Sequence, residues 1–272
     1  MSKLKGVAVI VVVYNPHVTD VCDRISNYDA AVDHVYIIDN SSKNQEKEFY
    51  NESRQNVTYV ALQSNKGIAY AQNFGAHLAM DHGYPFLLFF DQDSYIKGDE
   101  IKGLLSAAIA NDEVACASPS STNKTKYSSE TISSGSLIPS KKFEIVGDFQ
   151  EQLFIDFVDY EWCWRANAMG YRILEVAGVR LIHQIGSTNY RVGKLVSAPF
   201  RNYYYYRNFL FLLKSKSLNT KQSRKWMIKA LKHTIFELGF SPHRIKRLKY
   251  IFDGIRDGLS GHMGIMEGRD GN

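Results

Sequence analysis

Four short apolar runs, rich in β-branched and aromatic residues, alternate with stretches of helix-like composition in the N-terminal part of the chain. Runs this short and this continuously apolar are typical of strands covered on both faces, and each interval is long enough for a helix. The pattern predicts an α/β fold with a mostly parallel, Rossmann-like central sheet flanked by helices. The runs are Val7–Val13, His34–Asp39, Val57–Gln63 and Phe86–Phe90, and Gly67–Asp81 is one of the helical stretches.

The length and the first apolar run limit the classes of protein that this chain fits. The chain has 272 residues, enough for one large domain or for a domain of about 200 residues with an appendage. Its first apolar run is only about eight residues long before Tyr14, Asn15 and Pro16, too short to span a membrane, and no small-residue cleavage site follows it. We therefore expect a buried first strand in a cytoplasmic protein.

The charge of the chain is distributed unevenly. Residues 191–272 contain 17 Lys or Arg and 5 Asp or Glu, a net charge of +12. The whole chain has 33 and 28, so residues 1–190 have 16 basic and 23 acidic residues, a net charge of −7. The sequence thus divides into an acidic body, residues 1–190, and a basic, aromatic and helical extension, residues 191–272.

Polar residues follow each predicted strand near the point where the strand ends. The carboxyl ends of parallel strands meet at one edge of an open sheet, where the ligand crevice lies. We therefore expect these clusters to converge on one site. They are Tyr14-Asn15-Pro16, Asp39-Asn40-Ser41-Ser42, Asn65-Lys66-Gly67 and Asp91-Gln92-Asp93.

Asp91 and Asp93 are separated by a single residue after the run Phe86–Phe90. Two carboxylates at the end of a buried strand repel each other and lose hydration, so a cation or hydrogen-bond donors are needed nearby. A hard divalent cation such as Mg²⁺ or Mn²⁺ takes oxygen ligands and commonly bridges a carboxylate to a diphosphate. The alternative is a solvated turn in which Asp93 caps a helix that begins near Gly98.

Six motifs resemble, in their order along the chain, those of family 2 inverting glycosyltransferases with a GT-A fold. They are VVVYNP, IIDNSS, NKGIAYAQNFG, FFDQDS, SSGSLIP and VDYEWCWRANAMGYRI, and they span about residues 7 to 190. The DQDS form, together with the segment from Asp156 to Trp162, is most similar to the bacterial rhamnosyltransferase branch, which uses dTDP-L-rhamnose. The resemblance implies a dTDP-sugar or UDP-sugar donor, a glycan or lipid-linked acceptor, and Mg²⁺ or Mn²⁺ as cofactor.

The resemblance also implies which residues bind the nucleotide-sugar. Asp39 matches the position that accepts a hydrogen bond from the pyrimidine N3–H, although an Asx turn with Asn40 is an alternative role for it. Lys66 would offset phosphate charge, and Gly67 would let the backbone approach the ligand. The other expected contacts come from Tyr14, Asn15, Asn65, Asn73, Asp91, Gln92 and Ser136.

Three residues match metal-site positions in the resemblance. Asp93 matches the direct metal ligand, and Asp91 would face the ribose or the outer ligands of the metal. His183 matches a position that contacts the metal or the diphosphate in some relatives. A lone histidine after a strand can also be a structural residue with its hydrogen bonds satisfied, so both roles stay open.

Inversion at the anomeric carbon needs a base for the proton of the acceptor hydroxyl and a Lewis acid for the departing diphosphate. Asp159 matches the catalytic position of the family. Val158 replaces the acidic residue that is usual before it, and Glu161 is a competing candidate for the base. Arg165, four residues after Glu161, can pair with it and hold it in a structural role, which favours Asp159.

The extension contains a segment of helical composition, Lys221–Phe240. It has Met227, Leu231, Ile235 and Leu238 at helical spacing and lysines available for its other face. Such a helix can lie peripherally on an anionic membrane surface, where lipid-linked acceptors reside. The alternatives are packing on the body and contact with a second copy in a homodimer. Nucleic acid is not an expected partner, because no helix-turn-helix, zinc or RNA-binding signature accompanies the basic residues.

Two other functions are compatible with the same sequence features. A catalytically silent nucleotide-sugar-binding or scaffolding subunit would keep the fold, but the presence of Asp93, Asp159 and Arg165 argues against it. A nucleotidyltransferase shares the parallel sheet and the metal. It would have a glycine-rich loop with Lys or Arg after the first strand, where this chain has Tyr14-Asn15-Pro16-His17.

Overall fold

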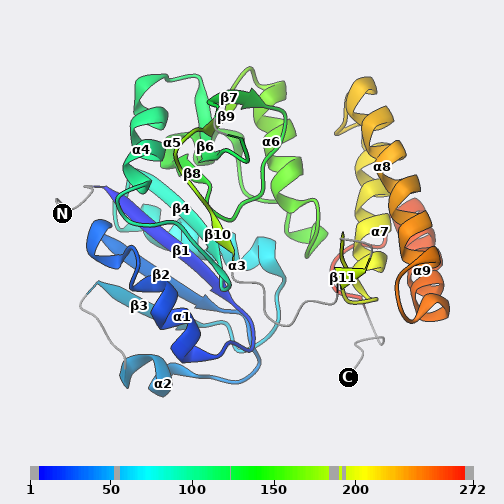
Figure 1. Ribbon diagram of the computed structural model, residues 1–272, viewed down its shortest axis with the longest axis horizontal. Helices are drawn as coiled ribbons and strands as arrows, with labels where there is room; N and C mark the ends of the chain where they lie inside the picture. Colours follow the sequence, from blue (N-terminus) through cyan, green and yellow to red (C-terminus); the bar gives the residue numbers. More distant parts are fainter. Residues whose placement is uncertain (1–5, 52–55, 123, 184–189, 192–193, 267–272) are drawn as a thin grey trace.

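The computed structural model describes residues 6–51, 56–122, 124–183, 190–191 and 194–266, and the fold is built on one mostly parallel sheet (Figure 1). The strand order is β3-β2-β1-β4-β8-β6-β9-β7; the first four run parallel, and β8 is antiparallel to both of its neighbours. The predicted α/β fold is confirmed. The strands are β1 Val7–Val13, β2 His34–Asp39, β3 Val57–Ala61, β4 Phe86–Asp91, β6 Val114–Pro119, β7 Lys126–Ser128, β8 Leu137–Pro139 and β9 Arg172–Val176.

Alternate residues of β1 point to opposite faces of the sheet, and helices cover both faces. Val9 and Val11 pack with residues of α1 and α4, whereas Ala8 and Ile10 pack with residues of α3, α5 and α6. Because every residue of β1 is buried, the run is apolar without alternation. The helices are α1 Val18–Ile25, α2 Glu46–Asn51, α3 Ile68–Asp81, α4 Ile101–Ala110, α5 Ser140–Val146 and α6 Val158–Ala168.

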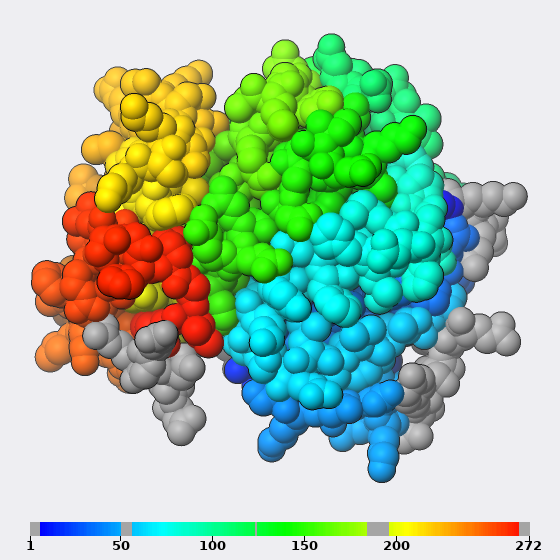
Figure 2. Space-filling model, turned by 180° about the vertical axis from the view of Figure 1, so that it is seen from behind, coloured from blue at the N-terminus to red at the C-terminus, as the bar shows by residue number. Residues whose placement is uncertain are grey.

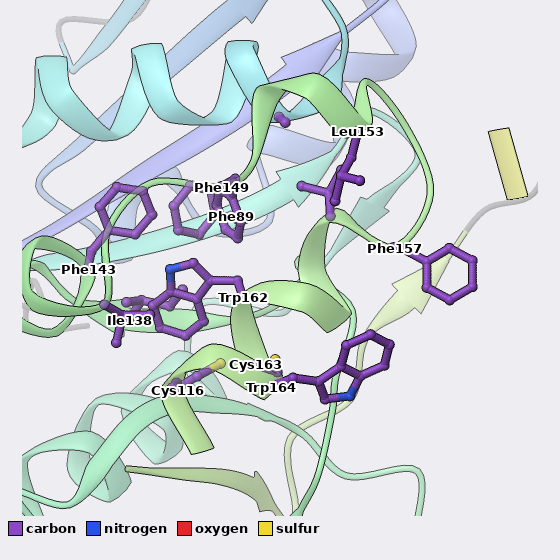
Figure 3. Packing of buried hydrophobic residues seen from close by; sticks show 14 of the residues in the cluster. Phe89, Cys116, Ile138, Phe143, Phe149, Leu153, Phe157, Trp162, Cys163 and Trp164 are labelled. Atoms are coloured by element: carbon purple, nitrogen blue, oxygen red, sulfur yellow. The ribbon is translucent and has the colours of Figure 1, made fainter. Parts of the chain in front are cut away.

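An aromatic cluster fixes α6 against the sheet (Figure 3). The Trp162 ring of α6 lies 6.3 Å from Phe143 and 6.1 Å from Phe149, measured between ring centroids, and Phe149 lies 5.5 Å from Phe89 of β4. Trp162 Nε1 also donates to the Gly147 carbonyl. The N-terminal turn of α6, which contains Asp159, is therefore held in a fixed position relative to the strand ends.

A short ribbon extends the carboxyl end of β4. Strand β5, Ser94–Tyr95, pairs antiparallel with β10, Ile182–His183, and places Ser94 opposite His183. A second ribbon consists of β11, Tyr190–Arg191, and β12, Lys194–Leu195. Helix α4 has Glu100 at its N-cap, so Asp93 does not cap a helix, and the alternative of a capping role is wrong.

Three helices of the extension form a layer on one side of the molecule (Figure 1) and pack directly against the body (Figure 2). They are α7 Arg201–Lys214, α8 Thr220–Gly239 and α9 Arg244–Ser260. A capping box of Asn219 and Gln222 starts α8, in agreement with the predicted helix. The Trp226 ring of α8 lies 4.9 Å from Phe157 and 5.2 Å from Tyr160 of α6. Among the described helices, none combines the length and the apolar character that a bilayer crossing requires.

Candidate active site

A cavity of about 480 Å³ opens where the carboxyl ends of β1 and β4 approach α6 and α7. Strand register brings these ends side by side, because Val13 pairs with Asp39 and Val12 pairs with Asp91. The cavity thus collects side chains from strand ends that are far apart in the sequence. Its lining includes Tyr14, Asn40, Asn65, Gly67, Asp91, Gln92, Asp93, Asp156, Asp159 and Arg201.

Asp91 and Asp93 form an acidic corner of this cavity, with His183 beside them. Burial, and then the charge of Asp93, raises the pKa of Asp91 to about 6. His183 Nδ1 lies 2.6 Å from Ser94 Oγ and 3.4 Å from Asp93 Oδ1. The structure therefore brings His183 to the acidic pair, and the bond to Ser94 fixes the orientation of its ring.

The donor atoms at this corner fit a divalent cation. Carboxylate oxygens and an imidazole nitrogen are ligands that Mn²⁺ accepts, and oxygens alone suit Mg²⁺. Asp93 and His183 would hold the ion, and its positive charge would offset the repulsion between Asp91 and Asp93. Within the described ranges, no group of three His, Cys, Asp or Glu side chains is already arranged as a metal site. Oxygen atoms of a bound diphosphate and water would therefore complete the coordination.

Side-chain amides hold the loop after β3 next to the end of β2. Asn40 Oδ1 accepts from the Lys66 backbone N–H at 2.7 Å, and Asn40 Nδ2 donates to Asn65 Oδ1 at 3.1 Å. Gly67 has φ of +89°, and a Cβ there would lie 2.7 Å from the Phe154 ring. Gly67 is therefore required for the close approach of this loop to Phe154. Asn40 lines the cavity, as expected for a member of the strand-end cluster after β2, although the sequence did not single it out as a ligand contact.

Asp39 is fully buried at the end of β2 and does not line the cavity. Its Oδ2 accepts from Tyr59 OH at 2.6 Å, and its Oδ1 accepts from the Ser41 N–H at 2.9 Å. The predicted Asx turn is therefore present: it passes through Asn40 and is closed by the N–H of Ser41. The contact of Asp39 with a pyrimidine stays a prediction.

Several predicted nucleotide-sugar contacts face the scaffold instead of the cavity. Asn73 exchanges two hydrogen bonds of 2.9 Å with the backbone of Phe149, and Ser136 Oγ donates to the Ile132 carbonyl at 2.6 Å. Both side chains are buried and stabilise the scaffold, and their expected contact with the donor stays a prediction. Asn15 and Lys66 flank the cavity without lining it.

Asp159 lies in the first turn of α6 and lines the cavity. Its Oδ2 accepts from the Ser133 N–H at 3.2 Å and its Oδ1 from the Tyr160 N–H at 2.9 Å. Burial raises the pKa of Asp159 to about 7, although these two hydrogen bonds lower it. A carboxyl group with a pKa near neutrality is suited to general-base catalysis.

Glu161 and Arg165 lie on the part of α6 that faces away from the cavity. Glu161 is 2% exposed, and its Oε1 accepts from Arg165 Nε and Gln150 Nε2, both at 2.9 Å. Arg165 also donates to the carbonyls of Val146 and Asp148. This pair ties α6 to α5 and the following loop, in agreement with the predicted structural pairing of Glu161 with Arg165. The choice of Asp159 over Glu161 as the base stays a prediction.

The loop before α6 has an unusual backbone conformation. Phe154, Asp156 and Phe157 all have φ between +64° and +67°, a region that is strained for side chains of this size. Asn208 of α7 stabilises the loop, because its Nδ2 donates to the carbonyls of Leu153, Ile155 and Asp156 at 2.8 to 2.9 Å. The extension thus helps to shape one wall of the cavity.

Arg201 is a cavity residue that the sequence did not predict. It begins α7 and pairs with Asp156 through both carboxylate oxygens, with a distance of 2.9 Å between Nε and Oδ2. The charge of Asp156 is the largest cause of the raised pKa of Arg201, and the charges of Asp91 and Asp159 raise this pKa further. The guanidinium of Arg201 is therefore a permanent positive charge close to Asp91 and to Asp159.

The sequence profile of the family described as Glycosyl transferase family 2 matches residues 8–165, more than half of the chain. The chain belongs to glycosyl transferase family 2. The predicted family is confirmed, and the matched residues of this glycosyltransferase run from β1 through Asp93 to Asp159 and Arg165.

One relative of this family 2 enzyme covers nearly its whole length. It is the dTDP-rhamnosyl transferase RfbF of Shigella flexneri, 28% identical over 285 residues, which cover 94% of this chain and 96% of the relative.

Solved structures show the GT-A fold of this family 2 enzyme. TarS residues 1–349 of S. aureus, in complex with UDP-GlcNAc, has a TM-score of 0.59 and 17% identity over 93% of this chain and 81% of that one. GalNAc-T7 with UDP, GalNAc and Mn²⁺ has a TM-score of 0.57 and 13% identity; 85% of this chain is covered, but only 57% of the GalNAc-T7 chain.

Proposed function

We propose that this glycosyltransferase moves L-rhamnose from dTDP-L-rhamnose to a hydroxyl group of a cell-surface or lipid-linked glycan, with inversion at the anomeric carbon. The observation that carries the proposal is the shared cavity of Asp159 with Asp91 and Asp93, which combines a proton acceptor with an acidic corner suited to a metal. Support for the donor sugar comes from the Shigella relative, which is a dTDP-rhamnosyl transferase.

Asp159 is the base in this proposal. The acceptor hydroxyl would approach its carboxylate from the cavity, and Asp159 would take the proton as the oxygen attacks the anomeric carbon. The backbone N–H groups of Ser133 and Tyr160 hold the two oxygens in place, so the group need not reorient during the reaction.

As the acceptor oxygen bonds to the anomeric carbon, the bond from that carbon to the diphosphate oxygen breaks and dTDP leaves. Positive charge is therefore needed at the diphosphate, where negative charge develops. A divalent cation bound at Asp93 and His183 would supply positive charge there. Arg201 would bind and orient the same diphosphate, because its guanidinium lines the cavity and is held by Asp156. Asn65 and Gly67 would contact the nucleotide from the loop after β3.

The test is a donor screen with the purified chain. In the presence of Mn²⁺, dTDP-L-rhamnose should raise the melting temperature more than UDP-GlcNAc or UDP-galactose, since a ligand stabilises the state that binds it. The same donor should be consumed in the presence of a glycan acceptor. NMR should show that the transferred sugar has the anomeric configuration opposite to that in the donor. A larger shift and faster turnover with a UDP-sugar would refute the rhamnose donor and keep the glycosyltransferase. Binding without turnover of any donor would favour a silent nucleotide-sugar-binding subunit.

A further inference from the structure

Helix α8 exposes an apolar stripe that the body does not cover. Met227, Leu231 and Ile235 are 55%, 63% and 58% exposed, and they recur every four residues, so they lie along one side of the helix. Trp226 and Phe236 are buried on the other side. The sequence predicted one apolar face on this helix, but the structure shows two, one packed inward and one turned outward.

Helix α9 repeats this arrangement. Ile245, Leu248 and Phe252 are 87%, 53% and 66% exposed at spacings of three and four residues. The opposite side packs tightly on α7: a Cβ on Gly254 would lie 2.4 Å from the Tyr203 carbonyl oxygen, and one on Gly258 would lie 2.6 Å from that of Arg207. The inner contact of α9 is thus already complete, and its outer stripe remains on the surface.

The acidic residues of these two helices are all engaged within the extension. Glu237 is 1% exposed and pairs with Arg247, while Asp253 and Asp257 pair with Arg256. Apart from Arg247 and Arg256, the basic residues of the two helices divide into two groups. Lys225 and Lys229 pair with Glu130 of the body. Exposed basic residues without a carboxylate partner in the part of the chain that the structure describes are Lys221, Arg224, Lys232, Arg244, Lys246 and Lys249.

We propose that the outer faces of α8 and α9 are a docking surface for an anionic lipid bilayer. A surface that presents apolar side chains, unpaired basic side chains and no unpaired carboxylate among the described residues complements acyl chains and acidic headgroups together. A two-fold contact between copies would instead place like charges opposite one another. The turn between the helices adds an open surface hollow lined by Phe240, Arg244, Ile245 and Lys249, which combines apolar with basic side chains as a lipid headgroup region requires.

This surface deepens the proposed function, since a lipid-linked acceptor lies in such a bilayer, but its test does not depend on turnover. The purified chain is floated with vesicles of phosphatidylcholine alone or with phosphatidylglycerol added. We expect binding only to the anionic vesicles, and weaker binding as salt increases.

The triple variant Arg244→Gln, Lys246→Gln, Lys249→Gln should lower the partition coefficient about 100-fold. The variant Leu231→Ser, Ile235→Ser should lower it by at least about 10-fold.

Matched controls remove equally exposed residues elsewhere. Ile109→Ser and Ile145→Ser replace side chains that are 64% and 52% exposed on α4 and α5, and Lys43→Gln, Lys97→Gln, Lys141→Gln removes three charges of the body. These variants should bind vesicles like the wild type.

Equal binding to neutral and anionic vesicles, or equal losses in controls and test variants, would overturn the proposal. A dimer that Leu231→Ser, Ile235→Ser dissociates, without vesicle binding by the wild type, would overturn it too. Turnover of dTDP-L-rhamnose with a short soluble acceptor should not change in any of these variants, so a wrong donor would be recognised separately.

Discussion

Arg201 and Asp156 form a two-point ion pair that joins the first helix of the extension to the loop that precedes the candidate base. The two residues are 45 positions apart in the sequence, and the Nε to Oδ2 distance is 2.9 Å. Asp156 is one of three loop residues with positive φ, and Asn208 of the same helix binds its carbonyl. The extension therefore shapes one wall of the candidate active site, in addition to carrying the proposed lipid-docking surface of α8 and α9.

The first prediction concerns Arg201. Replacement by Gln removes the positive charge that we assign to the diphosphate, so kcat/KM for donor should fall about 10²-fold, as it does when a preorganised stabilising donor is lost from other active sites. Arg256→Gln is the control, because Arg256 also pairs with an aspartate of the extension, Asp257, but does not line the cavity. Steady-state kinetics should separate the two variants; equal losses would assign Arg201 a purely structural role.

The second prediction uses two glycines with similar backbone angles. Gly67→Ala and Gly83→Ala both place a Cβ at positive φ, but only the first meets another group, the Phe154 ring at 2.7 Å. Each should lose about 1–3 kcal/mol of stability from the backbone strain. Gly67→Ala should also displace the loop around Phe154 and weaken donor binding by calorimetry. Undiminished donor affinity in Gly67→Ala would contradict the assigned contact.

The third prediction concerns the metal. Asp93→Ala should abolish the increase in dTDP affinity that Mn²⁺ produces in the wild type, and should leave the fold intact because it relieves repulsion with Asp91. Asp112→Ala, which removes an exposed carboxylate that pairs with Lys142 and does not line the cavity, is the control. Calorimetry with and without Mn²⁺ measures the effect. If Mn²⁺ still tightens dTDP binding to Asp93→Ala, the ion is held elsewhere.

The fourth prediction follows from the pKa of Asp159. Burial raises this pKa from 3.8 to about 7 in the folded state, so the folded protein binds an extra proton between these values and loses stability as the pH rises through them. Asp159→Asn removes this loss. The melting temperature of the variant relative to the wild type should therefore be higher at about pH 8 than at about pH 5. A pH-independent difference would show that the carboxyl group is not buried in this way.

The sequence predicted the fold better than the site, for a physical reason. Strand and helix positions follow from local apolar patterns, which is why Val7–Val13 and the segment around Lys221–Phe240 were found. Which way a polar side chain points depends on partners distant in the chain: Asn73 faces Phe149, not the cavity. Arg201 was missed for the same reason, since nothing in its neighbours indicates a partner 45 residues earlier. The exposed apolar stripe of α8 likewise becomes visible only in the structure. The spacing of apolar residues along the sequence does not tell which apolar face of a helix is packed and which is exposed.

The most direct test of the account is the turnover of Asp159→Asn beside that of Glu161→Gln. Asn keeps the shape of the side chain but takes up no proton near neutral pH, so kcat should fall at least about 10²-fold while donor affinity stays within about 3-fold. Glu161→Gln disturbs the pair with Arg165 away from the cavity, so it should lower the melting temperature and leave kcat of the folded enzyme nearly unchanged. Loss of turnover in Glu161→Gln, with turnover retained in Asp159→Asn, would contradict the assignment of the base.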